Sequence, residues 1–304
     1  MPPPRPSQLK AATVAPTDPQ LRARGGRPTY VAQPLGNSEQ AEVLAFLAER
    51  PVHTVIMSSF IRDNGVESPR NRGTFYGWRN ARGRLMGVAL IGHSLLFEAR
   101  DDASLRAFAA LPCAQAHMIM GEHDKVARLW LHHDPDGKHL HQLSHEWLLA
   151  QRWPVEATGA VRGLRRATQA DLDQVLTVHA EMAFAESGVN PLQVDPVGFR
   201  LRTSRRIERG RVWVWFEAGR LIFKTDVVAE TAEVIYLEGV YVNPAERGRG
   251  HGLRCLSQLS RVLLQRAATV CLLVNEQNLK ALALYQRAGF KPLCRYSTIY
   301  LPKH

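Results

Sequence analysis

The sequence has few cysteines and no long apolar run, and each absence excludes a class of protein. Its 304 residues include only four cysteines, none of them in a Cys-x-x-Cys pair, so a disulfide framework or a cysteine-based zinc site is not expected. The apolar runs at 85–91 and 267–274 are far shorter than the roughly 20 residues that cross a membrane. The first ten residues hold no apolar segment of a secretory signal. We therefore expect a cytoplasmic protein without a membrane partner.

Acidic residues are also scarce, and the resulting positive charge favours anionic partners. The chain has 28 acidic residues against 39 lysines and arginines, a formal charge of +11. Two arginine-rich segments, 200–211 and 247–254, carry part of the excess. No zinc-finger, homeodomain or RNA-binding pattern accompanies them. We therefore do not expect nucleic acid as a partner, and nothing in the sequence indicates an oligomeric state.

Length and patterning predict an N-terminal arm followed by two similar α/β domains. Residues 1–36 are rich in Pro, Gly and Arg without apolar periodicity, which is typical of a disordered or loosely ordered arm. The segment Trp78…Gly83-Arg84-Leu85 resembles Trp215…Gly219-Arg220-Leu221, and both stand at the same place in the order of elements. We predict a tandem α/β (α+β) arrangement with domains at 37–157 and 158–304, each a mixed, mostly antiparallel sheet flanked by helices.

Periodicity predicts alternating strands and helices in both halves. In the first half, strands are expected at 73–79, 85–91, 117–120 and 146–151, with helices at 41–47 and 53–62, after 102 and from 124. In the second half, strands are expected at 163–167, 212–216, 221–228, 234–242, 270–274 and 296–301, with helices at 168–182, 195–208, 253–267 and 278–288.

The segment Leu237–Leu253, LEGVYVNPAERGRGHGL, predicts a cradle for a phosphate-bearing ligand. A strand stops at Pro244, and a loop rich in Arg and Gly then opens a helix. Glycines let a ligand approach the backbone, and the N–H groups and dipole of the helix N-terminus attract an anion. The last glycine of the dinucleotide-binding fingerprint GxGxxG is missing, and no GxxxxGK[ST] string occurs. The cradle is therefore of another type.

Two motifs give this cradle a family resemblance. Arg247, Gly250 and Gly252 fill the pattern [QR]xxGx[GA], and residues 278–290 read NxxAxxLYxxxGF, about 26 residues further on. In this order the motifs resemble the GNAT superfamily of acyl-CoA-dependent N-acyltransferases over about residues 160–304. The whole layout is similar to bacterial two-domain proteins with a degenerate GNAT-like domain in front. Residues 120–124, where we expect the first domain's equivalent loop, lack an Arg and a Gly pair, so no pyrophosphate site is expected there.

The resemblance implies acetyl-CoA as co-substrate and direct transfer of its acetyl group to an amine of a small molecule or a protein. It also implies that the pantetheine arm lies along the strand before the loop and the pyrophosphate on the loop itself. The cofactor-binding residues that it assigns are Val240, Tyr241, Val242, Arg247, Gly248, Arg249, Gly250, His251, Gly252, Leu253, Asn278 and Tyr285.

The same resemblance suggests the catalytic residues. Tyr285 matches the family's usual acid, with a core aromatic as the alternative interpretation. Glu238 is a candidate base acting through water, with an ion-pair partner for a nearby arginine as the alternative. Leu273 stands where some relatives place a glutamate, so the identity of the base stays open. Glu181 and Glu186 lie on the acceptor side and are interpreted either as ligands of a cationic amine or as parts of a solvated helix face.

Two other functions stay open at this point. Tandem GNAT-like proteins include aminoacyl transferases that use charged tRNA, which the basic charge would suit, and a non-catalytic module that senses acyl-CoA would carry the same cradle. A histidine-rich segment at 132–145 lacks the Cys or carboxylate spacing of a fixed metal site. We therefore expect no metal.

Overall fold

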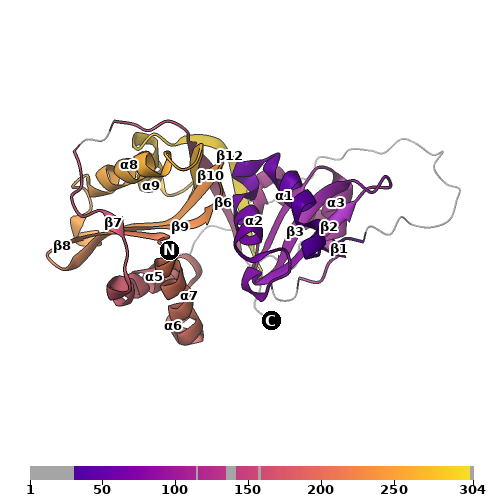
Figure 1. Ribbon diagram of the computed structural model, residues 1–304, viewed down its shortest axis with the longest axis horizontal. Coiled ribbons are helices and arrows are strands. Elements are labelled where there is room, and N and C mark those ends of the chain that lie inside the picture. The colour runs from indigo at the N-terminus through magenta and orange to yellow at the C-terminus, as the bar shows by residue number, and fades with distance from the viewer. Residues whose placement is uncertain (1–30, 114–115, 135–141, 157–158, 302–304) are drawn as a thin grey trace, which may run out of the picture.

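The computed structural model describes residues 31–113, 116–134, 142–156 and 159–301. Within these residues a single twelve-stranded sheet runs through both halves of the chain, with helices on both faces (Figure 1). Its strands are β1 (Gln33–Pro34), β2 (Gly73–Arg79), β3 (Leu85–Gly92), β4 (Leu95–Ala99), β5 (Met118–Glu122), β6 (Gln142–Gln151), β7 (Arg165–Arg166), β8 (Val212–Glu217), β9 (Arg220–Glu230), β10 (Val234–Val242), β11 (Thr269–Asn275) and β12 (Lys291–Tyr300). The helices are α1 (Gln40–Ala48), α2 (Pro51–Asn64), α3 (Asp102–Ala109), α4 (His123–His133), α5 (Leu172–Ser187), α6 (Pro191–Val194), α7 (Pro196–Glu208), α8 (His251–Leu263) and α9 (Leu279–Arg287).

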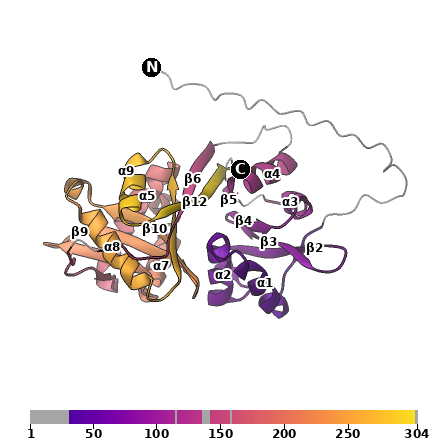
Figure 2. The same cartoon turned by 90° about the horizontal axis from the view of Figure 1, so that it is seen from above.

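The order of the strands is nearly symmetric about its centre: β1-β2-β3-β4-β5-β12-β6-β11-β10-β9-β8-β7. The last strand of each half lies between strands of the other half, because β6 pairs with β11 and β12 pairs with β5, all antiparallel. The two exchanged strands also pair with each other along their length, and Figure 2 shows them at the junction of the two lobes. The sequence predicted a separate sheet for each domain; the structure has one continuous sheet, because each half leaves a position that only the other half's last strand fills.

Two further predictions differ from the structure. Residues 1–30 of the predicted arm lie outside the described residues, whereas Gln33–Pro34 form β1 against β2. β4 was not predicted, because Leu95–Ala99 follows β3 after a two-residue turn and the pair reads as one apolar stretch. The division at 157/158 stays a prediction about domains.

Helices cover the second half of the sheet on both faces. α8 repeats apolar residues every three or four positions, so that Cys255, Leu256, Leu259 and Leu263 lie fully buried on one face. α8 and α9 share a core with β10 and β11, while α5 and α7 pack on the opposite face against β8 and β9. No helix in the described part of the chain is long and apolar enough to span a membrane.

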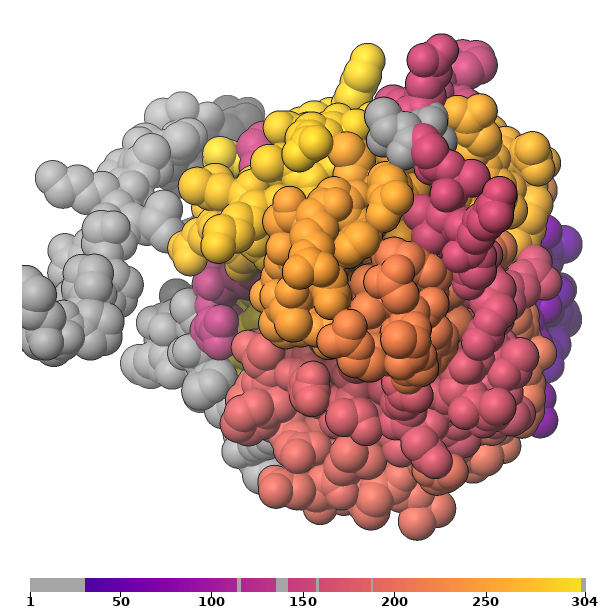
Figure 3. Space-filling view, turned by 90° about the vertical axis from the view of Figure 1, so that its left-hand side faces the viewer, coloured from indigo at the N-terminus to yellow at the C-terminus, as the bar shows by residue number. Residues whose placement is uncertain are grey.

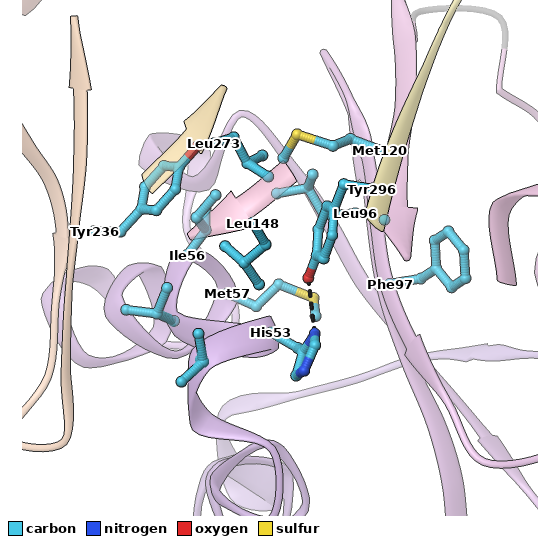
Figure 4. A pocket seen from close by; sticks show the side chains of 13 residues that line it. His53, Ile56, Met57, Leu96, Phe97, Met120, Leu148, Tyr236, Leu273 and Tyr296 are labelled. Carbon is cyan, nitrogen blue, oxygen red and sulfur yellow. Dashed lines mark hydrogen bonds between the residues drawn. The ribbon is translucent and has the colours of Figure 1, made fainter. Parts of the chain in front are cut away.

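α2 joins the halves over the exchanged strands. Val55 packs with Leu148 of β6, Tyr236 of β10 and Tyr296 of β12, and the hydroxyl of Tyr296 lies 3.1 Å from Nδ1 of His53. A cavity of about 30 Å³ remains beneath α2 (Figure 4), which is room for about one water molecule. Because the residues that line it are mostly apolar, we interpret the cavity as a packing defect of the core at the junction.

Candidate active site

The parallel strands β10 and β11 separate towards their C-terminal ends. Their pairing ends at Leu237 and Leu272, although β10 continues to Val242 and β11 to Asn275. Beyond that point β10 is paired only with β9 among the described strands, so its edge towards β11 offers free backbone N–H and C=O groups. This slot is bordered by the residues predicted to contact pantetheine, Val240, Tyr241 and Val242.

A β-bulge bends β10 where the slot begins. The register against β9 shifts between Glu238 and Tyr241, and Gly239 within the bulge has a φ of +62°. A Cβ on Gly239 would lie 2.8 Å from Nζ of Lys224. Both the backbone angle and the packing therefore favour glycine at this position.

The loop after β10 leaves the N-terminus of α8 open. Gly248 and Gly250 have φ of +81° and +77°, and apart from their own chain neighbours no described residue lies within 4 Å of a Cβ built on either. Gly250 is the N-cap and provides no side-chain cap, and the N–H of Arg254 makes the first helical bond, to the carbonyl of Gly250 at 3.1 Å. The preceding N–H groups of α8 thus lack helical partners and suit an anion. These residues fit the pyrophosphate of an acyl-CoA.

The side chains of the loop are held by other protein groups. Arg249 pairs with the buried Glu246 at 2.8 Å, and Nε of Arg247 donates to a backbone carbonyl of β10 at 3.1 Å. The ring of His251 packs edge-on against Trp215. The cradle is therefore built from the backbone, and the positive charge of its arginines is partly balanced by Glu246.

α9 carries the two predicted residues of the second motif. The side-chain oxygen of Asn278 accepts a hydrogen bond from the N–H of Ala281 at 3.1 Å and so caps the helix. Tyr285 is buried and its ring packs edge-on against Phe290. Burial, together with the charge of Glu186, raises the pKa of Tyr285 to about 12. Its phenol stays protonated at any working pH.

Three glutamates from different elements lie within electrostatic reach of one another. Water reaches both Glu238 on β10 and Glu186 at the end of α5, but the protein atoms around them reduce their hydration. This loss of hydration raises the pKa of both carboxyls, and that of Glu186 is raised further by Glu238 and Glu146. Arg206 opposes the shift at Glu238. Glu186 is therefore within electrostatic reach of Glu238, while Glu181 raises the pKa of Tyr241 instead.

Glu146 comes from the first half of the chain, on β6. It accepts hydrogen bonds from the hydroxyls of Thr298 at 3.0 Å and Ser144 at 3.3 Å, yet burial outweighs them and raises its pKa. Sequence reasoning missed Glu146 as a site residue. The strand was predicted, but no pattern in it indicates that it would lie between β11 and β12.

A compact group of charges lies beside Glu238 on β9. Asp226, directly opposite Glu238 in the sheet, pairs with Nζ of Lys224 at 2.8 Å, Nε2 of His179 at 2.9 Å and Nη1 of Arg206 at 4.0 Å. Burial would raise the pKa of Asp226, but Lys224 and His179 hold it far below its usual range. Burial lowers the pKa of Lys224. This network holds an ionised Asp226 beside Glu238.

Comparison with known proteins identifies this half of the molecule. Residues 182–290 match the sequence model of the acetyltransferase (GNAT) family. These residues form a GNAT domain. The match includes the slot, the cradle and Tyr285, and the GNAT fold supports acyl transfer in general. No curated protein matches the sequence.

Solved structures extend the likeness in fold over most of the chain. A Drosophila protein covers 90% of this chain and 99% of its own, with 13% identity and a TM-score of 0.66. A tandem GNAT protein from the clavulanic acid biosynthesis pathway covers 90% and 99%, with 14% identity and a TM-score of 0.55. A GNAT-family acetyltransferase from Colwellia psychrerythraea covers 85% and 97%, with 15% identity and a TM-score of 0.53. At such identities the likeness shows a shared fold alone.

The first half has a slot equivalent to that of the GNAT domain, and ion pairs bridge it. β4 and β5 pair only at Leu95–Leu96, and Glu98 and Glu122 lie further along these strands. Arg50 donates to Glu98 at 3.1 Å and to Glu122 at 2.6 Å, and Lys125 pairs with Glu122 at 2.9 Å. Burial alone would raise the pKa of Glu122, but these hydrogen bonds lower it to about 2. The slot is therefore held closed by charged side chains.

The helix that follows this slot is capped by an acid. Asp101 accepts a hydrogen bond from the N–H of Ser104 at 2.8 Å at the start of α3, and its negative charge disfavours a phosphate there. The β4–α3 loop is the equivalent of the cradle. Residues 120–124, which the sequence suggested for that place, instead span the end of β5 and the start of α4.

The described residues that could bind a metal already contact other protein groups. His132 lies 3.2 Å from Asp102 and His145 lies 3.2 Å from the hydroxyl of Ser297, while His139 and His141 lie outside the described residues. Among the described residues one set of donors, His53, Glu122 and Cys294, lies within 4.8 Å of one another. In that set the carboxylate of Glu122 already binds Arg50 and Lys125. These two cationic side chains would compete with a metal cation.

Proposed function

We propose that the protein is an acetyl-CoA-dependent N-acetyltransferase that transfers the acetyl group directly to an amine of a small molecule or a protein. One observation carries this proposal: the slot between β10 and β11 leads to the uncapped N-terminus of α8 within a GNAT domain. The space-filling view of this end of the molecule shows the later, orange-to-yellow part of the chain above the pink surface of the α5 region (Figure 3). The acceptor would lie on the α5 side of the sheet, where the three glutamates are.

The backbone would bind the co-substrate. The backbone groups of Val240–Val242 that face the slot and have no partner would hold pantetheine and the acetyl carbonyl, and the N–H groups from Gly248 to Leu253 would hold the pyrophosphate. The side-chain amide nitrogen of Asn278, which takes no part in the helix cap, would contact the pantetheine arm. Bound acetyl-CoA supplies an activated thioester, and the residues of the chain supply position and proton transfer.

Proton transfer would be divided between the two faces of the sheet. Glu238 would take the proton of the incoming ammonium, directly or through water. Before this transfer, the negative charges of Glu146 and Glu186 would stabilise the bound ammonium group. A raised pKa brings a glutamate closer to the working pH, where a base is most effective. Tyr285 keeps its phenolic proton and would donate a hydrogen bond to the leaving sulfur.

Release of the CoA thiol tests the proposal. With acetyl-CoA and a panel of amines, we expect amine-dependent thiol release by the intact protein. Tyr285→Phe should lower kcat by about 10²–10⁴-fold, the usual range for a catalytic acid, while acetyl-CoA binds with nearly unchanged affinity. Phe216→Leu, a partly buried aromatic of a separate core cluster, is the control for a general packing effect.

The other outcomes favour the alternatives. Acetyl-CoA binding without amine-dependent thiol release would indicate a module that senses acyl-CoA. Absence of acetyl-CoA binding, with acyl transfer from charged tRNA, would indicate an aminoacyl transferase instead.

A further inference from the structure

A group of arginines at the junction of the halves holds surplus positive charge. Arg72 follows the short helical turn Pro69–Asn71 in the first half, and it lies near Arg202 and Arg206 of α7. Burial lowers the pKa of Arg72, and the charges of these two arginines lower it further. Asp195, whose charge acts in the opposite direction on Arg72, is already bound by Arg202 at 2.9 Å.

Two of these guanidinium groups are available to a ligand. Among the described residues, the side chain of Arg72 makes no hydrogen bond or ion pair, and that of Arg206 has one ion pair, with Asp226 at 4.0 Å. Water reaches both. Next to them, burial and the charges of Arg72 and His117 lower the pKa of His93 to about 4, so this histidine is neutral at working pH. The two arginines thus form the positive part of the surface.

This positive surface adjoins the acidic part of the proposed acceptor cleft. Arg206 lies 4.0 Å from Asp226, and Asp226 is directly opposite Glu238 in the sheet. The charge of Arg206 accordingly favours the ionised form of Glu238, and Glu238 in turn raises the pKa of Glu186. An ammonium group would be attracted to the glutamates, and an anionic group on the same molecule to Arg72 and Arg206. A plain polyamine would be repelled by the arginines.

We propose that the acceptor is a small amine that also bears an anionic group, in the manner of an amino acid, with Arg72 and Arg206 binding the carboxylate. The planar guanidinium fork matches a carboxylate and also a phosphate. This inference rests on the proposed N-acetyltransferase function and names the acceptor for the same site.

Matched pairs of acceptors test the proposal, with thiol release from acetyl-CoA as the assay. The pairs are L-leucine and L-leucinamide, L-phenylalanine and 2-phenylethylamine, and O-phosphoethanolamine and ethanolamine; the last pair separates a phosphate from a carboxylate. We expect KM for the acid of a pair to be about tenfold or more below that of its neutral partner, since a hydrogen bond to a charged group contributes at least that factor.

Variants assign the effect to the two arginines. Arg72→Gln should raise KM for the acids about tenfold and leave kcat and the KM of the neutral amines nearly unchanged. Arg206→Gln should raise KM for the acids by a similar factor, and because loss of its charge raises the pKa of Glu238 further, it should change kcat equally for both members of a pair. Arg205→Gln, at the neighbouring exposed position of α7, is the matched control. Equal KM values within each pair, or an equal rise of KM for both members in the variants, would overturn the proposal.

Direct binding separates this proposal from the proposed function. Each pair is titrated calorimetrically into the full chain, and acetyl-CoA is titrated separately. Binding of acetyl-CoA together with equal binding of acids and neutral amines, or with no binding by any acid, overturns the acceptor proposal and leaves the acetyltransferase intact. Preferential binding of the acids without any acetyl-CoA binding contradicts the proposed function alone.

Discussion

At the scale of single residues, the candidate active site contains ionisable groups whose pKa values are shifted in directions that suit acyl transfer. Glu238, Glu186 and Glu146 all have raised pKa values, and Tyr285 keeps its proton. The motifs assign Tyr285 and the cradle glycines to the site from local spacing alone. Glu146 could not be predicted, because its place depends on a strand pairing between distant parts of the chain.

The raised pKa of Glu238 predicts a pH-dependent gain in stability on its removal. A carboxyl whose pKa is higher in the folded than in the unfolded chain contributes stability below its ordinary pKa, about 4.3, and that contribution is lost as pH rises through the folded value. At pH 7.5 Glu238 therefore weakens the fold relative to a neutral side chain. Glu238→Gln should raise Tm at pH 7.5, and the gain should shrink towards pH 4.5 in thermal denaturation followed by circular dichroism.

Glu181→Gln, on the exposed side of α5, is the control for loss of a negative charge. A gain in Tm that does not depend on pH, or a loss at pH 7.5, would contradict this account of Glu238. The same Glu238→Gln variant should lower kcat, because it can no longer accept a proton.

At the scale of elements, the site depends on how β10 is bent and on how α8 begins. Most strands and helices of the second half were predicted to within a few residues, because their apolar periodicity is regular. The slot was implied by family resemblance alone, since no periodicity indicates where two parallel strands separate. β4 was missed because the turn before it is only two residues long.

The bulge in β10 predicts a large effect of a single methyl group. Gly239→Ala should destabilise the protein by about 1–3 kcal/mol through its left-handed backbone and its contact with Lys224. Gly219→Ala has a similar φ of +74° and open space around the new Cβ, so it should cost only the backbone part, about 1 kcal/mol. Urea denaturation measures both, and equal losses would argue against a packing constraint at the bulge.

At the scale of the whole molecule, the two halves complete each other. β6 lies between β11 and β12, and α2 covers the junction. Asp63 at the end of α2 binds Arg211 at 2.7 Å and Arg209 at 3.3 Å. The repeat of the hairpins was visible in the sequence, but strand exchange was not. Two separate sheets and one sheet with exchanged strands need the same local sequence patterns.

Strand exchange predicts that the halves do not fold independently. Residues 158–304 alone lack β6, so β11 and β12 lose the strand between them and expose unpaired edges. We expect this fragment to be insoluble or unfolded, and its co-expression with residues 1–157 to restore a folded complex, as judged by size-exclusion chromatography and circular dichroism. A soluble, folded fragment 158–304 that binds acetyl-CoA would contradict the account and support two self-contained domains.

The most direct measurement of the central claim is a calorimetric titration of acetyl-CoA into the intact chain. The account predicts one binding site per chain, because the slot of the first half is bridged by Arg50 and Lys125. Binding should be lost in Gly250→Asp, which adds a negative charge to the cradle, and kept in Gly83→Asp, which has the same kind of backbone and open space in a distant turn. Two sites per chain, or equal binding by the two variants, would contradict the assignment of the site to the second half.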